Sequence, residues 1–375
     1  MNFLFACGGT AGHINPALGV AGRLRELMPD CSILFIGAED KMERELVPRE
    51  GYPLRTVAVS NLSRSISREG FRHNLKAVEQ LAASMPACRK IIKEFKPDVV
   101  IGTGGYVCYP VLRQAARMGI PTLVHESNAK PGLTTKLLEN YVDRIMVGFE
   151  EARSNYKRQE KVAVTGTPVR TGFLNADRQQ ARRELGLDEN EPLVVSVWGS
   201  LGATEMNKTV ASMIAQAMKD KPFHLIHSAG KRGIAGMTEY LRDELGLTGW
   251  DEAGFEVREY LYDMPRLMAA ADLVLCRSGA STLAELTALG RCAVLVPSPN
   301  VVNNHQETNA RVLEHGGGAV VLLEKDATAE KMLSTITGLL DDREKLAKME
   351  ENMRAMSVGN ATDEIVFMIL SLAKS

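Results

Sequence analysis

The sequence lacks several features that define whole classes of protein. Its 375 residues carry 45 Lys and Arg against 46 Asp and Glu, a formal net charge of −1. No overall field would therefore hold nucleic acid or an anionic membrane, and any such attraction must be local. The six scattered cysteines include no C-x-x-C pair, which argues against a zinc site or disulfide framework and favours a reducing compartment. Without a basic leader or a long apolar run, we expect neither export nor a membrane span.

Short apolar runs alternate with helix-length amphipathic stretches, which is typical of βαβ units and parallel sheets. The first series predicts strands at Asn2–Cys7, Ser32–Gly37, Thr56–Val59, Asp98–Gly102, Thr122–His125, Arg144–Val147 and Val162–Val164. After a polar stretch, a second series predicts strands at Leu193–Trp198, Phe223–Ser228, Asp272–Cys276, Ala293–Pro297 and Ala319–Leu323. We therefore expect two doubly wound α/β domains, a hinge and cleft near 166–170, and a terminal helix at Ala361–Leu372.

Four predicted strands end in glycine-bearing loops, at 8–13, 102–106, 199–202 and 277–282. At the carboxyl ends of parallel strands, glycine lets backbone N–H groups approach an anion at a helix N-terminus. These loops indicate a phosphate-containing ligand, and the alternative is that they are tight turns without a ligand. The first loop matches neither G-x-G-x-x-G nor a P-loop, which removes the best support for hydride transfer.

Two local patterns leave alternatives open. Asn15 and Pro16 predict the N-cap and first residue of a helix, which puts His13 at the tip of the preceding loop. There the helix dipole favours a neutral, basic imidazole, although a lone loop histidine is more often structural. The pattern Thr282-Leu-Ala-Glu285 has two equally weighted interpretations. It is either a helix capping box, or a site in which the preceding backbone amides bind a diphosphate and the Glu285 carboxylate accepts hydrogen bonds from a ribose diol.

Seven motifs together resemble the MurG family in order and spacing. They are Gly8–Pro16, Gly104–Tyr106, His125–Asn128, Gly166–Arg170, Gly199–Ser200, Arg277–Glu285 and Asn304–Gln306, spread over nearly the whole chain. The family completes lipid II by transferring N-acetylglucosamine from UDP-N-acetylglucosamine to lipid I. The resemblance implies a GT-B architecture of two Rossmann-like domains and inversion without a cofactor or an essential metal. Ala11 departs from the family, since many members carry glycine there.

The resemblance also implies domains and site residues. Residues 1–168 with helix 358–375 would face the acceptor and membrane, and residues 169–357 would bind the donor. His13 would be the base, and Gly104, Gly105 and Tyr106 would form the acceptor diphosphate loop. Donor-binding residues would be Thr10, Gly12, Asn128, Arg170, Ser200, Leu261, Ala280, Ser281, Thr282, Glu285, His305 and Gln306. Of these, Glu285 would hold the ribose, Leu261 beside Tyr260 the uracil, and His305 and Gln306 the sugar hydroxyls.

A lipid-linked acceptor requires access to a bilayer from the cytoplasmic side. Within 63–78, basic residues recur every fourth position with apolar residues between them, which indicates a helix lying on an anionic membrane. The contact residues would be Arg64, Arg68, Phe71, Arg72, Leu75 and Lys76, and the alternative is a solvated charged face over core residues. Two other functions stay open: a UDP-N-acetylglucosamine 2-epimerase, which shares the architecture, and a transferase acting on another lipid.

Overall fold

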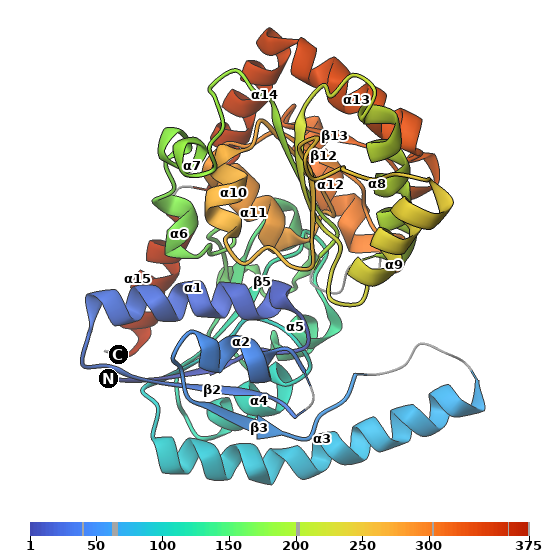
Figure 1. Ribbon diagram of the computed structural model, residues 1–375. Coiled ribbons are helices and arrows are strands. Elements are labelled where there is room, and N and C mark those ends of the chain that lie inside the picture. The colour runs from blue at the N-terminus through green and yellow to red at the C-terminus, as the bar shows by residue number, and fades with distance from the viewer. Residues whose placement is uncertain (40, 62–66, 200–202, 302–303, 359, 374–375) are drawn as a thin grey trace. The chain divides into compact units, whose positions relative to one another are not determined.

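The computed structural model describes residues 1–39, 41–61, 67–199, 203–301, 304–358 and 360–373, and it divides into two compact units (Figure 1). Unit 1 comprises Met1–Thr171 and Val358–Ser375, and unit 2 comprises Gly172–Ser357. Ser200 and Arg64, two residues with expected roles, lie outside the described residues.

Unit 1 is built on a seven-stranded parallel sheet in the order β3-β2-β1-β4-β5-β6-β7. Its strands are β1 (Asn2–Ala6), β2 (Ser32–Ala38), β3 (Leu54–Val57), β4 (Val99–Gly102), β5 (Thr122–Glu126), β6 (Arg144–Val147) and β7 (Val162–Val164). Its helices are α1 (Ala11–Leu27), α2 (Glu43–Arg49), α3 (Arg68–Phe95), α4 (Cys108–Arg117), α5 (Leu133–Leu138) and α15 (Ala361–Ala373). The central strands are almost wholly buried, which explains why they read as continuous apolar runs.

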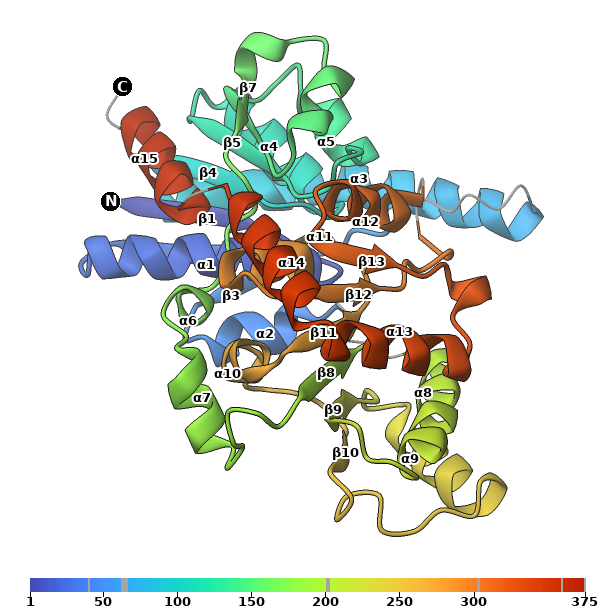
Figure 2. The ribbon, with the colours of Figure 1, turned by 90° about the horizontal axis from the view of Figure 1, so that it is seen from above.

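Unit 2 is built on a six-stranded parallel sheet in the order β10-β9-β8-β11-β12-β13 (Figure 2). Its strands are β8 (Leu193–Val197), β9 (His224–Ser228), β10 (Phe255–Arg258), β11 (Leu273–Cys276), β12 (Ala293–Leu295) and β13 (Ala319–Val321). Its helices are α6 (Thr171–Leu174, which begins one residue earlier, in unit 1), α7 (Arg178–Glu184), α8 (Thr204–Ala217), α9 (Ile234–Glu239), α10 (Met264–Ala270), α11 (Ala280–Leu289), α12 (His305–His315), α13 (Ala329–Asp341) and α14 (Arg343–Ala355). The prediction of two doubly wound α/β domains is confirmed.

Two local expectations are wrong. The strand β10 is absent from the expected series because it lies at the sheet edge, where only Phe255 is buried and polar residues alternate with apolar ones. The helix α1 begins at Ala11 with Thr10 as N-cap, so Pro16 lies inside it. Ala11 is helical and needs no positive φ, so its departure from glycine carries no backbone strain.

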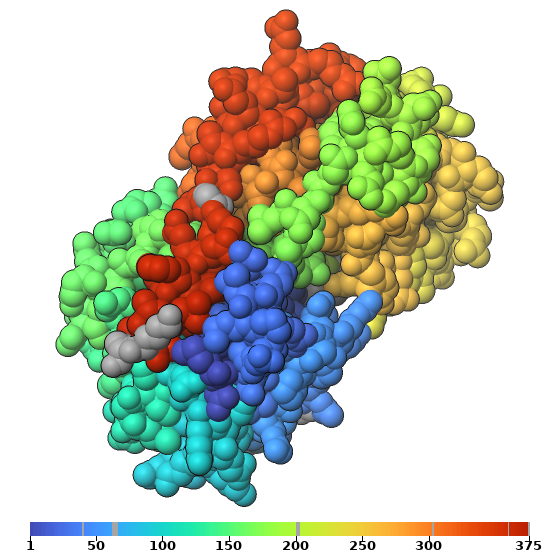
Figure 3. Space-filling view, turned by 90° about the vertical axis from the view of Figure 1, so that its left-hand side faces the viewer, coloured from blue at the N-terminus to red at the C-terminus, as the bar shows by residue number. Residues whose placement is uncertain are grey.

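The helix α15 completes the core of unit 1 although 186 residues of unit 2 separate it from the rest of that unit. Ile365, Val366 and Ile369 are almost fully buried against the cluster that holds Phe3 and Phe5. The helix lies beside α1 (Figure 3). Arg23 of α1 pairs with Asp363 at 2.5 Å. The terminal helix predicted at Ala361–Leu372 therefore docks on unit 1.

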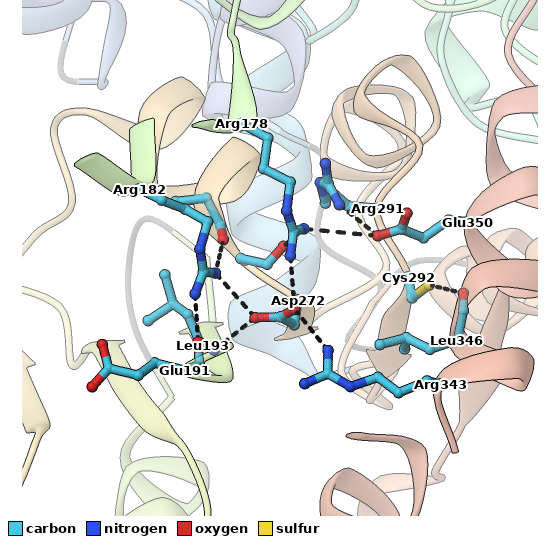
Figure 4. Close-up of polar contacts among 12 residues, drawn as sticks. Arg178, Arg182, Glu191, Leu193, Asp272, Arg291, Cys292, Arg343, Leu346 and Glu350 are labelled. Carbon is cyan, nitrogen blue, oxygen red and sulfur yellow. Dashed lines mark hydrogen bonds and ion pairs between the residues drawn. The ribbon is translucent and has the colours of Figure 1, made fainter. Parts of the chain in front are cut away.

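A buried charge cluster fastens the base of β11 in unit 2 (Figure 4). Asp272 pairs with Arg178 at 2.7 Å and with Arg182 at 3.2 Å, and it accepts a hydrogen bond from the Leu193 amide at 2.8 Å. Arg182 also donates to the Ala270 carbonyl at 2.9 Å. The cluster ties α7 and β8 to the strand whose other end carries the loop at 277–279.

Candidate functional site

The two sheets share a topological feature that locates candidate sites. In unit 1 the strand order reverses between β1 and β4, and in unit 2 it reverses between β8 and β11. Ligands of open α/β sheets bind beyond the carboxyl ends of strands at such points. The four glycine-bearing loops follow these four strands in sequence, and the strand order places the loops after β1 and β4 side by side in unit 1. Of the loop after β8, residues 200–202 lie outside the described residues.

His13 lies in the first turn of α1, held by groups of both loops of unit 1. Its Nδ1 is 2.9 Å from the Gly8 carbonyl oxygen, and its own carbonyl accepts a hydrogen bond from the Thr103 hydroxyl at 2.7 Å. Because a carbonyl can only accept, Nδ1 carries the proton and Nε2 keeps its lone pair in the neutral ring. The expected place at a loop tip is therefore wrong: these tertiary bonds support a helical turn ahead of Pro16.

The His13 ring packs directly against Gly104, where any side chain would clash with it. Its φ is +116°, and a Cβ there would lie 2.4 Å from His13 Cδ2. At Gly105, also with positive φ, a Cβ would lie 2.3 Å from the Gly8 carbonyl oxygen. Tyr106 follows, 40% exposed. The structure thus brings the expected base and the expected acceptor loop into contact.

A buried carboxylate that was not predicted from the sequence holds the loop that begins at Gly8. Glu43, the first residue of α2, is fully buried. Its Oε1 accepts a hydrogen bond from the Ala38 amide at 2.8 Å, and its Oε2 accepts one from the Gly9 amide at 3.1 Å. Acidic residues are common in the first turn of a helix and are usually exposed there. The sequence around Glu43 therefore contains no local signal that this glutamate is buried.

Glu126 is a second buried carboxylate, and it holds the turn that contains Asn128. Its Oε1 accepts hydrogen bonds from the Asn128 backbone and side-chain amides at 3.1 and 2.9 Å. Its Oε2 accepts from the Gly132 amide and the Thr135 hydroxyl, both at 2.8 Å. Four donors on a carboxylate that is 6% exposed fix the turn that presents Asn128. Glu126 lies within the His125–Asn128 motif, but the sequence alone indicates no role for it.

His125 links the same strand end to the chain segment that leads out of unit 1. Its Nε2 is 2.9 Å from the Gly166 carbonyl oxygen, and its Nδ1 is 3.2 Å from the Ser127 hydroxyl. Burial lowers the pKa of His125, so the ring is neutral at physiological pH. Arg170, four residues after Gly166, is half-buried.

In unit 2, α11 follows β11 and begins at Ala280 with Gly279 as N-cap and no side-chain cap. Its first intrahelical bond joins the Leu283 amide to the Gly279 carbonyl at 3.0 Å, so the amides of residues 280–282 precede it. The capping-box interpretation is wrong, because Thr282 is the third helical residue and Glu285 lies in the second turn. Both Ser281 and Glu285 are largely buried, at 9% and 8% exposed.

Side chains fasten the loop after β11 to the loop after β12. The buried Ser278 hydroxyl donates to the Gln306 carbonyl at 2.8 Å, and the Gln306 side-chain oxygen accepts from the Ser298 amide at 2.9 Å. His305 precedes Gln306 as the first residue of α12 and is half-buried. Gln306 and the start of α11 are therefore held next to each other.

Arg277 is a further residue to which the sequence analysis gave no role. Its Nη1 donates to the Val296 carbonyl at 3.0 Å and pairs with Glu324 at 2.5 Å, and its guanidinium lies 5.5 Å from the centre of the Trp198 ring. It therefore joins the carboxyl ends of β8, β11 and β12.

The remaining expected residues spread over the carboxyl edges of the two sheets. Thr10 is exposed at the N-cap of α1, where its carbonyl accepts from the His13 amide at 3.0 Å, and Gly12 follows inside the helix. Leu261, after β10, is 4% exposed, between Tyr260 and Tyr262, whose ring centroids are 4.7 Å apart.

The N-terminal half of α3 exposes apolar side chains among basic ones. Phe71, Leu75 and Val78 are 65%, 51% and 57% exposed. Arg68, Arg72 and Lys76 are exposed on the same turns, in the part of α3 that extends past the sheet of unit 1 (Figure 1). We call these six residues the α3 face. Among the helices within the described ranges, none has the length and hydropathy of a bilayer span.

Family models match most of the chain. The N-terminal domain of glycosyltransferase family 28 matches residues 3–147, and the C-terminal domain of that family matches residues 193–365. Two curated relatives share the printed name UDP-N-acetylglucosamine–N-acetylmuramyl-(pentapeptide) pyrophosphoryl-undecaprenol N-acetylglucosamine transferase. The one from Acetivibrio thermocellus is 44% identical over 100% of this chain and 99% of its own length. The one from a Thermoanaerobacter species is 43% identical over 99% of this chain and 100% of its own.

Solved structures give the same fold. The crystal structure of MurG from Acinetobacter baumannii is 26% identical with a TM-score of 0.73, covering 99% of both chains. A UDP-GlcNAc 2-epimerase from Neisseria meningitidis, solved with bound UDP-GlcNAc, is 15% identical with a TM-score of 0.67 over 99% of this chain and 100% of its own. The second similarity is one of fold alone.

Proposed function

The chain belongs to the MurG family within glycosyltransferase family 28, and on that premise we propose that it transfers N-acetylglucosamine from UDP-N-acetylglucosamine to the MurNAc 4-hydroxyl of lipid I, with inversion, to form lipid II. The observation that carries the proposal is the 44% identity to a transferase of that name over the whole chain. The proposed domains are 1–168 with 358–375 for the acceptor and 169–357 for the donor.

We assign the donor to the start of α11. A diphosphate there would receive amide hydrogen bonds from residues 280–282 and the favourable end of the helix dipole. Glu285 would accept hydrogen bonds from the ribose hydroxyls, because a carboxylate suits two vicinal donors. Leu261 would face the uracil, and His305 and Gln306 would meet the sugar hydroxyls. The amides of residues 280–282 and the helix dipole would then stabilise the negative charge that develops on the departing UDP.

We assign the proton transfer to His13. A sugar hydroxyl must lose its proton as it attacks the anomeric carbon, and the hydrogen bond from His13 Nδ1 to Gly8 leaves Nε2 to accept that proton. Gly104, Gly105 and Tyr106 would hold the acceptor diphosphate beside this ring. Asn128, fixed by Glu126, and Arg170 would contact the donor from unit 1.

The test is UDP release from UDP-N-acetylglucosamine with and without a lipid I analogue. Release that requires the analogue, with formation of a disaccharide, supports the proposed acceptor. Release without stimulation by the analogue contradicts it, and stimulation by a diacylglycerol instead would identify another lipid acceptor. Conversion of the UDP-sugar to an isomer of equal mass without UDP release would identify an epimerase.

We also propose that the α3 face rests on the cytoplasmic surface of the cell membrane. Three apolar side chains more than half exposed can enter the interface, and each of the three basic residues contributes about 1 kcal/mol on anionic lipid. Flotation with vesicles that contain anionic lipid tests this. Arg68→Glu with Arg72→Glu should abolish flotation, and the matched pair Arg89→Glu with Lys93→Glu, on the second half of α3, should not. Equal flotation of the two pairs would contradict the proposal.

A further inference from the structure

The carboxylate of Glu43 reaches His13 through one peptide group. The Gly9 amide donates to Glu43 Oε2 at 3.1 Å, and the Gly8 carbonyl oxygen lies 2.9 Å from His13 Nδ1. That amide and that carbonyl belong to the same peptide unit. The carboxylate, the peptide and the imidazole therefore form one chain of hydrogen bonds.

Glu43 uses both of its carboxyl oxygens as acceptors. They accept hydrogen bonds from the backbone amides of Ala38 and Gly9, which is the pattern suited to a carboxylate, since a carboxylate offers acceptors only. Two other titratable groups face it, the thiols of Cys7 after β1 and Cys108 in α4. Burial raises the pKa of both thiols, to about 12 for Cys108, so both are neutral. Glu126, at the end of β5, also acts electrostatically on the Cys108 thiol.

Three glycines allow the groups around this peptide to pack closely. A Cβ at Gly8 would lie 2.5 Å from Glu43 Oε1, and one at Gly37 would lie 2.4 Å from Glu43 Cγ. On the other side, a Cβ at Gly105 would lie 2.3 Å from the Gly8 carbonyl oxygen. Backbone without side chains therefore encloses the chain of hydrogen bonds from two sides.

We propose that Glu43 is a positioning residue that raises the basicity of His13 through the Gly8–Gly9 peptide. A carboxylate that accepts from a peptide N–H polarises the carbonyl of that peptide, which becomes a stronger acceptor for the imidazole Nδ1–H. The negative charge stabilises the imidazolium that forms when Nε2 takes a proton, as a directly bonded carboxylate does in other catalytic histidines. The inference rests on the proposed function, in which His13 is the base.

The test replaces the charge and measures His13 itself. In Glu43→Gln, the midpoint of the His13 ring titration, followed by NMR, should fall by about 0.5–1 pH unit, because a charge one peptide away no longer stabilises the imidazolium. In the pH profile of kcat/KM, the midpoint of the acidic limb should move to lower pH by the same amount. The Kd for UDP should stay unchanged. Glu45→Gln, an equal charge change on the exposed side of α2, should leave the midpoint in place. An unchanged midpoint in Glu43→Gln would overturn the proposal.

A second measurement needs no substitution. In the unaltered protein the neutral His13 ring should be the Nδ1–H tautomer, and the Gly9 amide proton should shift with the same midpoint as the ring. The Nε2–H tautomer, or a Gly9 amide that does not follow the ring, would overturn the proposal even if Glu43→Gln fails to fold. Neither readout depends on turnover, so a failure of the proposed transferase activity would be seen separately, as no product from lipid I.

Discussion

Replacing Asp272 should lower the free energy of unfolding of unit 2 more than a surface substitution does. The Asp272 and Arg182 side chains are each 4% exposed, and Asp272→Ala would leave the Arg182 guanidinium buried beside carbonyl groups without its carboxylate. Losing one partner of a buried pair costs about 3–5 kcal/mol. The Leu193 amide would also lose its acceptor, which costs about 1–3 kcal/mol. These losses share one carboxylate and do not add, so we expect about 4 kcal/mol.

Urea unfolding followed by tryptophan fluorescence measures this cost for unit 2 alone. The chain has two tryptophans, Trp198 and Trp250, and both belong to unit 2. In a thermal scan the same change corresponds to a midpoint lowered by about 8–16 °C for a unit of this size. Asp272→Asn, which keeps an acceptor for Leu193, should lose about 2–3 kcal/mol.

Asp220→Ala is the matched control, because Asp220 is an exposed aspartate of the same unit. It should change the free energy of unfolding by less than about 0.5 kcal/mol. If Asp272→Ala were equally mild, the cluster in Figure 4 would contribute no net stability and our reasoning would be refuted.

Four further predictions concern the site and its support. His13→Ala should lower turnover about 10²-fold or more while calorimetry finds UDP binding intact; near-normal turnover would remove His13 as base. Glu285→Ala should weaken UDP affinity roughly tenfold in the same titration, and unchanged affinity would remove the ribose contact. Gly104→Ala should lower turnover at least tenfold, because its Cβ would meet His13, whereas Gly119→Ala, also at positive φ but in open space, should cost about 1 kcal/mol of stability and no activity; equal activities would contradict the contact. Burial lowers the pKa of His227 to about 3, so the unfolded chain binds a proton that the folded one does not, and stability of unit 2 should fall as pH falls below about 6.5, by up to about 1.4 kcal/mol per pH unit; His227→Gln should flatten this slope in urea unfolding between pH 7 and 5, and an identical slope would contradict it.

The strands were predictable because a buried parallel strand is apolar on both faces. Arg144–Val147 and Val162–Val164 have the predicted bounds, and most other strands differ by one or two residues. The strand β10 has one neighbour and partly exposed side chains, so its sequence carries no continuous apolar run. The start of α1 shows the limit of local rules: Pro16 favours a first-turn position, yet bonds from Thr103 and Gly8 support an earlier turn.

The candidate site was predictable where a motif contains its own residues and not where a distant side chain supports it. His13, Gly104 and Gly105 occur in quoted motifs, and the structure brings them together. Glu43 bonds Gly9 from 34 residues away, a link that depends on β1 and β2 being neighbours. Glu126 lies within its own motif, but only the fold shows that its carboxylate collects four donors.

The return of α15 to unit 1 has a consequence for synthesis on the ribosome. Unit 2 is continuous in sequence and can fold as soon as it emerges, whereas the apolar surface that Ile365, Val366 and Ile369 cover stays open until the last helix is made. A nascent or prematurely terminated chain therefore exposes the first-made half to chaperones and proteases while the second-made half is already closed.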